Sequence, residues 1–302
     1  MGVFLLNATR KARDIPWRLR WKLDEFRRRG TPTGHLLISF PLVIQNVVAT
    51  PLTNRQHVGA TTSLAGLQAI MNQYLGEMIS YEAEAEGQLF QDMVPNPDLA
   101  QTQTSLGSAT ELELHVEQAF SRWRPDVVSL ACLRGDPEAK TYVFHVKDAL
   151  KHLTSAERRL LWEPLWTIGV DLSFKMHGQE FVDGDQRGPL PILHAICGDD
   201  IDNEQNNNIG WVFDQDLMRG INPSAEDLRL KLIDVYIKHR NYIILKPGDL
   251  LWIDNQRAVH GRSPYVPRFD GTDRFLVRSF VTYDLLKSAS VRQGRMVLAK
   301  YS

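Results

Sequence analysis

Residues 111–118, ELELHVEQ, carry the pattern that decides how this chain is built. Side chains two apart on a β-strand point to the same face of the sheet. Leu112 and Leu114 therefore point one way, whereas Glu113, His115 and Glu117 point the other way. This alternation predicts a half-buried strand. It also places an imidazole and a carboxylate where both can reach one metal ion.

A third candidate ligand is His260, at the end of the segment LWIDNQRAVH. Two histidines and one carboxylate can hold Fe(II) on one face and leave the opposite face open, which is the ligand set of non-haem iron oxygenases. The spacing alone is weak evidence, because a 302-residue chain with nine histidines and 36 acidic residues should contain His-x-Asp/Glu roughly once by chance. The metal prediction therefore needs support from the rest of the chain.

Strand patterns dominate the chain after residue 110. One such pattern precedes this point, at residues 34–43, and the others occupy residues 126–133, 140–146, 190–197, 210–216, 242–246, 250–255 and 274–283. Helical spacing marks residues 61–83, 147–162 and 224–240, with Ser224 as an N-cap candidate. A Pro-Gly-Asp turn at 247–249 joins two of the strand patterns like a hairpin. The pattern predicts an α+β fold with a strand-rich, barrel-like core and flanking helices, in a single domain over residues 1–302.

Composition excludes several classes of partner. The formal net charge is −1 and the pI is near 6.8, so the chain has no overall attraction for nucleic acid or anionic membranes. No apolar run approaches the ~18 residues that span a bilayer, and the N-terminus lacks the charge order of a secretory signal. We therefore expect a cytoplasmic enzyme that meets a small-molecule ligand in a local site. Cys132 and Cys197 lie in apolar runs without CxxC spacing, which predicts buried thiols.

The N-terminal segment, residues 1–30, is basic. Nine Arg or Lys residues lie between positions 10 and 29, interleaved with apolar side chains that include Trp17 and Trp21. This pattern predicts an amphipathic helix. It fits either a contact with an anionic surface or a helix that packs its aromatic side on the body, and we favour the second interpretation.

Two charged pairs could bind a small molecule. Arg274 and Arg278 are four apart on a predicted strand, so both project from one face, about 13 Å apart along the chain. Such guanidiniums can each bind a carboxylate, although ion pairs with Asp270, Asp273 or Asp284 are an equal alternative.

Asp214 and Asp216 in FDQD can clamp an ammonium or guanidinium group, and the alternative is an Asp cap on the following turn. In YEAEAEG we expect a solvated face for at least two of Glu82, Glu84 and Glu86.

The motifs in order resemble a known family. ELELHVEQAF, PDVVSLACLRGD, FDQDLMRG and GDLLWIDNQRAVHGRSPYVPRFDGTDRFLVRSF are similar to segments of the clavaminate-synthase-like Fe(II)/2-oxoglutarate dioxygenases, and most of all to hydroxylases of free basic amino acids, especially lysine. The similarity spans roughly residues 34–284 and covers residues 1–30 poorly. It implies a double-stranded β-helix, jelly-roll or cupin-like, with a lid insertion at about residues 199–224.

The resemblance also implies a role for each candidate in the metal and cosubstrate sites. His115, Glu117 and His260 would bind the iron, and Arg274 would bind the distal carboxylate of 2-oxoglutarate. Retention of Glu117 implies hydroxylation, because halogenating relatives replace that carboxylate with a small residue. The sequence departs from the family in Val116, where a threonine is usual, but this is not a ligand position.

For the substrate, the resemblance implies contacts at five positions. Arg278 would hold the α-carboxylate, and the Asp214 and Asp216 pair would hold the side-chain cation. Glu84 and Ser105 match two further substrate-contacting positions in the loop ahead of the metal strand.

The implied activity is Fe(II)- and 2-oxoglutarate-dependent hydroxylation, with O₂, of a β or γ C–H of a free L-amino acid in specialised metabolite biosynthesis. A lysine-like or cyclic, pipecolate-like substrate fits, as does an arginine-type hydroxylase or a desaturase at the same iron. A non-catalytic barrel that binds an amino acid or a metal is the alternative from another class, and the joint presence of Arg274 and the three ligands argues against it. The sequence leaves the particular amino acid, the stereochemistry and the oligomeric state open.

Overall fold

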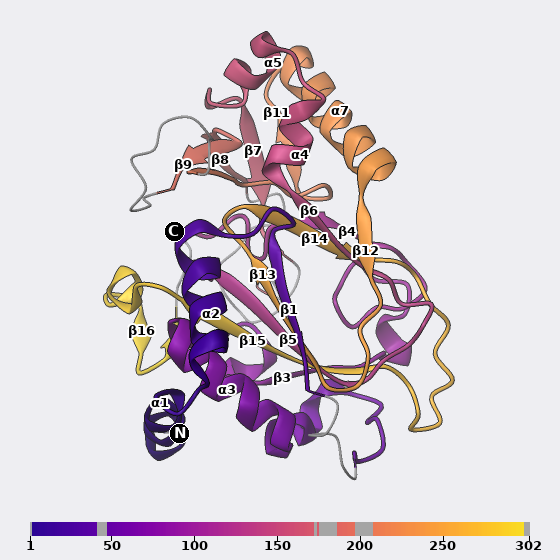
Figure 1. Ribbon diagram of the computed structural model, residues 1–302. Coiled ribbons are helices and arrows are strands. Elements are labelled where there is room, and N and C mark those ends of the chain that lie inside the picture. The colour runs from indigo at the N-terminus through magenta and orange to yellow at the C-terminus, as the bar shows by residue number, and fades with distance from the viewer. Residues whose placement is uncertain (1, 41–46, 172–173, 175–185, 197–207, 299–302) are drawn as a thin grey trace.

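The fold is described by a computed structural model that covers residues 2–40, 47–171, 174, 186–196 and 208–298. Its centre is made of two β-sheets (Figure 1). Within the described residues, the larger sheet has eight strands in the order β1-β13-β5-β15-β2-β17-β16, and the eighth, β3, also pairs with β15. These strands are β1 (His35–Ser39), β2 (Glu77–Tyr81), β3 (Gln91–Met93), β5 (Val127–Arg134), β13 (Asp249–Asp254), β15 (Phe275–Thr282), β16 (Arg292–Gln293) and β17 (Met296–Val297).

The second sheet has four antiparallel strands in the order β12-β6-β14-β4. They are β4 (Leu112–His115), β6 (Thr141–His145), β12 (Asn241–Ile243) and β14 (Ala258–Arg262). Two smaller sheets lie beyond them, one of β9 (Leu193–Ala195) and β10 (Ile209–Trp211), the other of β7 (Trp166–Gly169), β8 (Gln186–Leu190) and β11 (Met218–Gly220). The predicted α+β class with a strand-rich core is confirmed.

Alternation along the strands of the large sheet sorts side chains between two cores. On β13, Leu251 and Ile253 join a cluster that also contains Phe144 and Val259 of the second sheet. Leu250 and Trp252 of the same strand face the other way, into a cluster with the N-terminal helices. Successive side chains of a strand alternate between its faces, so a strand covered on both faces is apolar throughout.

Helices cover the outer face of the large sheet. These are α1 (Gly2–Ala12), α2 (Trp17–Arg29) and α3 (Ser63–Leu75), and their buried side chains share one cluster with that face. The amphipathic helix predicted over residues 10–29 forms only from Trp17 to Arg29, as α2, whereas residues 10–12 end α1. Helix α2 buries Leu23 and Phe26 fully. The predicted packing of the aromatic side on the body holds for Phe26 but not for Trp17 and Trp21, which are 66% and 58% exposed. On the far side of the molecule lie α4 (Val146–Lys151), α5 (Ser155–Leu160) and α7 (Pro223–His239) (Figure 1).

The predicted helix over residues 61–83 is too long. It ends at Leu75, and β2 begins at Glu77 and pairs with β15. Gly76 separates the two elements, and a Cβ at this position would lie 2.6 Å from the carbonyl oxygen of Thr282. The absence of a side chain lets the chain approach β15 there, so strand pairing replaces helical spacing.

Two other local predictions differ from the structure. The side chain of Asn222, not that of Ser224, caps α7 by accepting from the backbone N–H of Ala225. The hairpin predicted around residues 247–249 does not form, because β12 pairs with β6 whereas β13 pairs with β1 and β5. The Pro-Gly-Asp turn instead carries the chain from one sheet to the other, with Gly248 at a φ of 92°.

Two further predictions concern membrane-spanning segments and the cysteines. No helix in the described part of the chain is long and apolar enough to cross a membrane. Cys132 is a free, buried thiol as predicted, and burial raises its pKa to about 12. Cys197 lies outside the described residues.

We expect the buried His145 to make the fold sensitive to acid. Its Nδ1 accepts from the backbone N–H of Lys147 at the start of α4, and burial lowers its pKa from 6.5 to about 4. Between pH 6.5 and pH 4 the unfolded chain therefore binds a proton that the native state excludes. The free energy of unfolding should fall as the pH drops through this window, by up to about 3 kcal/mol for this group.

The variant His145→Asn keeps a side-chain acceptor at the cap but cannot titrate. In urea denaturation between pH 6.5 and pH 4 we expect it to lose less stability than the wild type, while the exposed His152→Asn control follows the wild type. Parallel curves for His145→Asn and the wild type would show that this histidine is not the acid-sensitive group.

Candidate metal centre and active site

Strand pairing brings the three predicted metal ligands together. His115 ends β4, and His260 is its register partner on β14. The two imidazole rings are 4.3 Å apart between centroids. Glu117 follows two residues after His115, and one ligand atom from each of the three lies within 4.8 Å of the others. Val116, between the ligands, is fully buried in the core between the sheets, where an apolar side chain is suitable.

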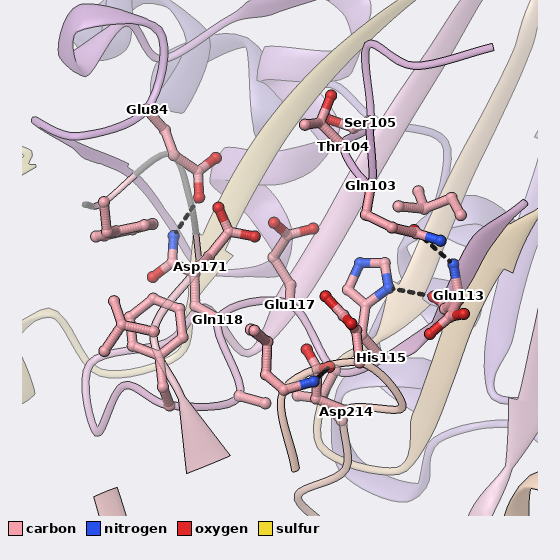
Figure 2. Close-up of a pocket in the computed structure, with 18 of the residues that line it drawn as sticks. Glu84, Gln103, Thr104, Ser105, Glu113, His115, Glu117, Gln118, Asp171 and Asp214 are labelled. Carbon is pink, nitrogen blue, oxygen red and sulfur yellow. Dashed lines mark hydrogen bonds between the residues drawn. The ribbon is translucent and has the colours of Figure 1, made fainter. Parts of the chain in front are cut away.

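Hydrogen bonds outside the ligand set fix its orientation. The Nδ1 of His115 is 2.7 Å from the backbone carbonyl oxygen of Glu113, so Nε2 is the atom left for a metal (Figure 2). Asn255, at the end of β13, accepts from the backbone N–H of Glu117 at 2.8 Å and donates to its carbonyl at 3.1 Å. Such groups hold ligands in position and set the histidine tautomer.

The charges of the three groups suit a divalent cation. Burial raises the pKa of the Glu117 carboxyl, but the charges of Arg278 and the histidines outweigh burial and hold it at about 2. Burial and the neighbouring His115 lower the pKa of His260 to about 4. Its Nε2 lies 3.5 Å from a carboxylate oxygen of Glu117. A neutral imidazole beside an ionised carboxylate is the form that metal binding requires, so the residues fit a ferrous ion.

A small cavity lies beside the three metal ligands. Its lining is mostly apolar but also contains polar groups. It is lined by Met93, Val128, Leu130, Thr141, Leu276, Arg262 and Arg274, together with the three ligands and Arg278. Arg274 is buried and, among the residues that the structure describes, has no carboxylate within ion-pair distance, so the alternative pairing with Asp270, Asp273 or Asp284 does not occur. The hydroxyl of Thr141 is also buried and without a hydrogen-bond partner. A free guanidinium and a free hydroxyl in one cavity fit a ligand carboxylate.

Arg278 lies on the same face of β15 as Arg274 but is already paired. Its guanidinium donates to Glu84 at 2.5 Å, to Glu117 at 3.1 Å and to the amide oxygen of Gln91 at 2.9 Å. Glu84 in turn accepts from Gln118 at 3.0 Å. Burial raises the pKa of Glu84 to about 7 in spite of the arginine. The guanidinium therefore links the metal ligand Glu117 to the predicted substrate contact Glu84.

The main cavity, of about 280 Å³, lies over the metal ligands and is strongly acidic. Figure 2 shows Glu84 and Gln118 toward one end, Glu113 toward the other, and Glu117 and His115 between them. Six carboxylates line the cavity, those of Glu84, Glu113, Glu117, Asp171, Asp214 and Asp216. Arg278 is the one guanidinium among the described lining residues.

The predicted substrate contacts all border this cavity. Asp214 faces it and also caps the following turn, since its Oδ1 accepts from the backbone N–H of Leu217 at 2.7 Å. The cap interpretation is therefore confirmed for Asp214, whereas the binding of a cation by the Asp pair stays a prediction. Burial raises the pKa of Asp214 to about 6. Ser105 lines both cavities, whereas Glu82 and Glu86 are exposed, as expected.

Sequence reasoning missed Thr141, Asn255 and Glu113. The alternation that placed His115 and Glu117 on one face also placed Glu113 there, so its position was available without the structure. Thr141 and Asn255 act through residues more than 100 positions away in the sequence, and no local pattern indicates such a contact.

Comparison with known proteins places these features in one class. The chain is 48% identical over 301 residues to an L-lysine 3-hydroxylase from Catenulispora acidiphila, which covers 99% of this chain and 82% of the relative. The solved structure of an asparagine oxygenase with Fe(II), 3-hydroxyasparagine and succinate superposes with a TM-score of 0.86 at 29% identity, covering 97% of this chain and 88% of that one. The non-haem iron oxygenase OrfP with Fe and α-ketoglutaric acid superposes with a TM-score of 0.83 at 26% identity, covering 98% and 91%.

Together, the double-stranded β-helix and the His-x-Glu and His ligand set define a non-haem iron enzyme that uses Fe(II) and 2-oxoglutarate. The chain belongs to the family described as taurine catabolism dioxygenase TauD, TfdA family, whose sequence profile matches residues 42–280. Clavaminate synthase 2 from Streptomyces clavuligerus is also among its relatives, which confirms the resemblance inferred from the motifs.

Removal of one ligand should abolish metal binding without unfolding the protein. For His115→Ala we expect at least a ~100-fold loss of metal affinity and no turnover, because even groups that only support a ligand are worth 10- to 100-fold. Equilibrium dialysis with Co(II) as the probe measures the affinity. The control His152→Ala replaces an exposed histidine that stacks on His239. Equal Co(II) affinity in the two variants would exclude His115 as a ligand.

Proposed function

We propose that this protein is an L-lysine 3-hydroxylase. Hydroxylation of a free amino acid with Fe(II) and 2-oxoglutarate follows from the family and its relatives, and the choice of lysine is our inference. The observation that carries this choice is the acidic cavity over the metal ligands, where five carboxylates besides Glu117 face one guanidinium. The 48% identity to a lysine 3-hydroxylase supports both the substrate and the position of attack.

Each part of the metal and cosubstrate sites has a proposed role. His115, Glu117 and His260 hold the iron on one face. The guanidinium of Arg274 and the hydroxyl of Thr141 bind the distal carboxylate of 2-oxoglutarate. When bound, the iron and 2-oxoglutarate supply the oxidising chemistry with O₂, and the reaction yields succinate, CO₂ and the hydroxylated amino acid. The apolar side chains around Arg274 exclude water from this end of the site.

The amino acid head group belongs near Arg278. Its guanidinium binds the α-carboxylate of the substrate, while the nearby carboxylate of Glu84 accepts from the α-ammonium. Because Arg278 also bonds to the metal ligand Glu117, the head group is fixed close to the iron. Gln91 and Gln118 hold the arginine and the glutamate in place, so the geometry exists before the substrate enters.

The side-chain ammonium belongs at the opposite end of the cavity, near Glu113, Asp214 and Asp216. Burial raises the pKa of the Glu113 carboxyl. Repulsion from neighbouring carboxylates raises it further, and the effect of Asp216 is the largest of these. An ammonium group that lies between them relieves this repulsion. Lysine is therefore favoured over asparagine, which brings no positive charge to this end. Held at both ends, lysine presents a carbon near its head group to the iron.

We also propose four finer points, which concern a lid, the domain, the location and a second substrate. The described part of residues 199–224 contributes Asp214 and Asp216 to the cavity, and we propose that the segment acts as a lid; residues 199–207 lie outside the described residues. We propose a single catalytic domain over residues 1–302. A cytoplasmic location is consistent with the free amino acid and 2-oxoglutarate that the enzyme uses, and cyclic pipecolate is the second substrate candidate.

A substrate panel tests the proposal. The protein is reconstituted anaerobically with Fe(II) and 2-oxoglutarate and exposed to air with L-lysine, L-ornithine, L-arginine, L-asparagine or L-pipecolate. We expect lysine to give the highest kcat/KM, with succinate and a product heavier by one oxygen at C3, assigned by NMR. A preference for asparagine would contradict the lysine assignment, and a product that has lost two hydrogens would indicate desaturation.

Neutralising the distal carboxylates should weaken lysine binding more than it slows the reaction. For Asp216→Asn and Glu113→Gln we expect KM for lysine to rise about 10- to 100-fold, since a hydrogen bond to a charged group contributes about 1.5–3 kcal/mol. Glu111→Gln is the matched control, because this carboxylate lies nearby on the same chain segment but pairs with Arg240 outside the cavity. Equal KM values for Glu113→Gln and Glu111→Gln would remove Glu113 from the substrate site.

A further inference from the structure

A third cavity, of about 490 Å³, lies away from the active site and shares none of its lining residues. Its wall is formed by the end of α2, the segment that enters β5, the end of β9, the turn between β13 and β14, and the segment after β15. Figure 1 shows α2 and β9 along the same side of the molecule. Segments from both ends of the sequence therefore meet at this cavity.

The cavity is basic, in contrast to the active site. Arg124 lies within it, and Arg27, Arg28 and Lys287 are exposed at its edge. None of these four cations has a carboxylate within 4.0 Å in the described part of the chain. A fifth lining cation, Arg257, is paired with Asp254. The local surplus of positive charge is notable in a chain whose net charge is −1.

The two acidic residues in the lining form no ion pair with these cations in the described part of the chain, although the charge of Asp126 attracts both Arg124 and Lys287. Asp126 is occupied by the fold: it accepts from the side chains of Gln256 and Thr282 and from the backbone N–H of Tyr283. Asp284 accepts from the backbone N–H of Leu286. Neither carboxylate forms an ion pair with Arg124 or Lys287. Arg124 donates to the backbone carbonyl of Ser121 at 3.2 Å and Arg27 lies over the ring of Tyr283, so within the described residues these cations have contacts but no carboxylate partner.

Two residues of the lining each carry a polar side-chain atom that has no partner in the described part of the chain. The hydroxyl of Tyr283 and the Nδ1 of His194 are both buried and form no hydrogen bond. Burial and the charges of Arg124 and Lys287 lower the pKa of His194 to about 4, so its ring is neutral. Buried polar atoms without partners are rare in folded proteins and often indicate a ligand or an ordered water.

We propose that this cavity binds a phosphate group, either as inorganic phosphate or as part of a larger metabolite. The cations come from three separate parts of the chain, so their charged groups approach from different directions, and a tetrahedral dianion can accept from all of them. A planar carboxylate would satisfy one arginine through its two oxygens and leave the others without a partner. The Tyr283 hydroxyl supplies a further donor to the same anion.

The position of the cavity connects it to the metal centre. Pro125 lines the cavity, and its carbonyl accepts from Asn255 at 2.8 Å. The same Asn255 side chain bonds to both backbone groups of Glu117. Gln256, the next residue, also lines the cavity and bonds to Asp126. An anion bound here therefore steadies the turn that supports a metal ligand, and we expect it to raise the stability of the holoenzyme.

The test measures anion-dependent thermal stability of the enzyme with Fe(II) and 2-oxoglutarate under anaerobic conditions. Sulfate is the first probe, because it is a tetrahedral dianion that does not sequester ferrous iron, and chloride at matched ionic strength is its reference. Inorganic phosphate and a sugar monophosphate follow, with affinities from calorimetry. We expect a saturable rise in Tm and dissociation constants on the order of 1 mM or lower.

The variant Arg124→Gln with Lys287→Gln removes two cations of the cavity. We expect it to bind sulfate and phosphate at least tenfold more weakly, while its lysine turnover without added anion equals that of the wild type. The matched control, Lys151→Gln with Lys238→Gln, removes two exposed lysines on α4 and α7 and should bind anions like the wild type. Lys287→Gln alone provides a milder variant in case the double variant folds poorly.

The outcomes are distinct. Tighter binding of the sugar monophosphate than of phosphate would identify a phosphorylated metabolite, and equal binding would identify phosphate itself; both support the site. A Tm that rises without saturation, or by the same amount in the cavity variant and the control, would show a general salt effect and overturn the proposal. The anion-binding and Tm measurements do not use the amino acid substrate, so their outcome is independent of the lysine assignment; the turnover of the variant serves only to show that its active site is intact.

Discussion

The pairing of β4 with β14 is the constraint on which the rest of this structure depends. His115 and His260 are register partners across that pair, so both imidazoles leave the sheet on the same face. A slip of one residue would send one of them to the opposite face, because side chains alternate along a strand. The register is held in turn by the apolar residues between the ligands, of which Val116 is fully buried. The metal site and the hydrophobic core therefore specify each other.

Burial of so many charges beside one another is costly unless each has a partner. The protein meets this requirement with a chain of contacts in which Arg278 joins Glu117 to Glu84, and Gln118 and Gln91 complete the hydrogen bonds. Arg274 differs from Arg278, because within the described residues this buried guanidinium has no carboxylate partner. An unpaired buried cation is unfavourable in the free protein, and a dicarboxylate cosubstrate removes that penalty when it binds.

Average composition conceals how charge is arranged here. A net charge of −1 excluded a global attraction for polyanions, yet the fold gathers carboxylates over the metal ligands and cations in a separate cavity near α2. Asn255 lies between the two regions and touches a backbone group of each. The two cavities thus share one structural support although they attract ligands of opposite charge.

The sequence by itself determined the features that depend on neighbouring residues. Strand alternation placed His115 with Glu117 and Arg274 with Arg278, and motif order identified the family. Only the tertiary structure decided which strands meet: that β12 and β13 lie in different sheets, that α3 gives way to β2 at Gly76, and that Thr141 and Asn255 reach the site. The physical reason is that periodicity reports which face a side chain occupies, whereas contacts between residues more than 100 positions apart depend on how whole sheets pack.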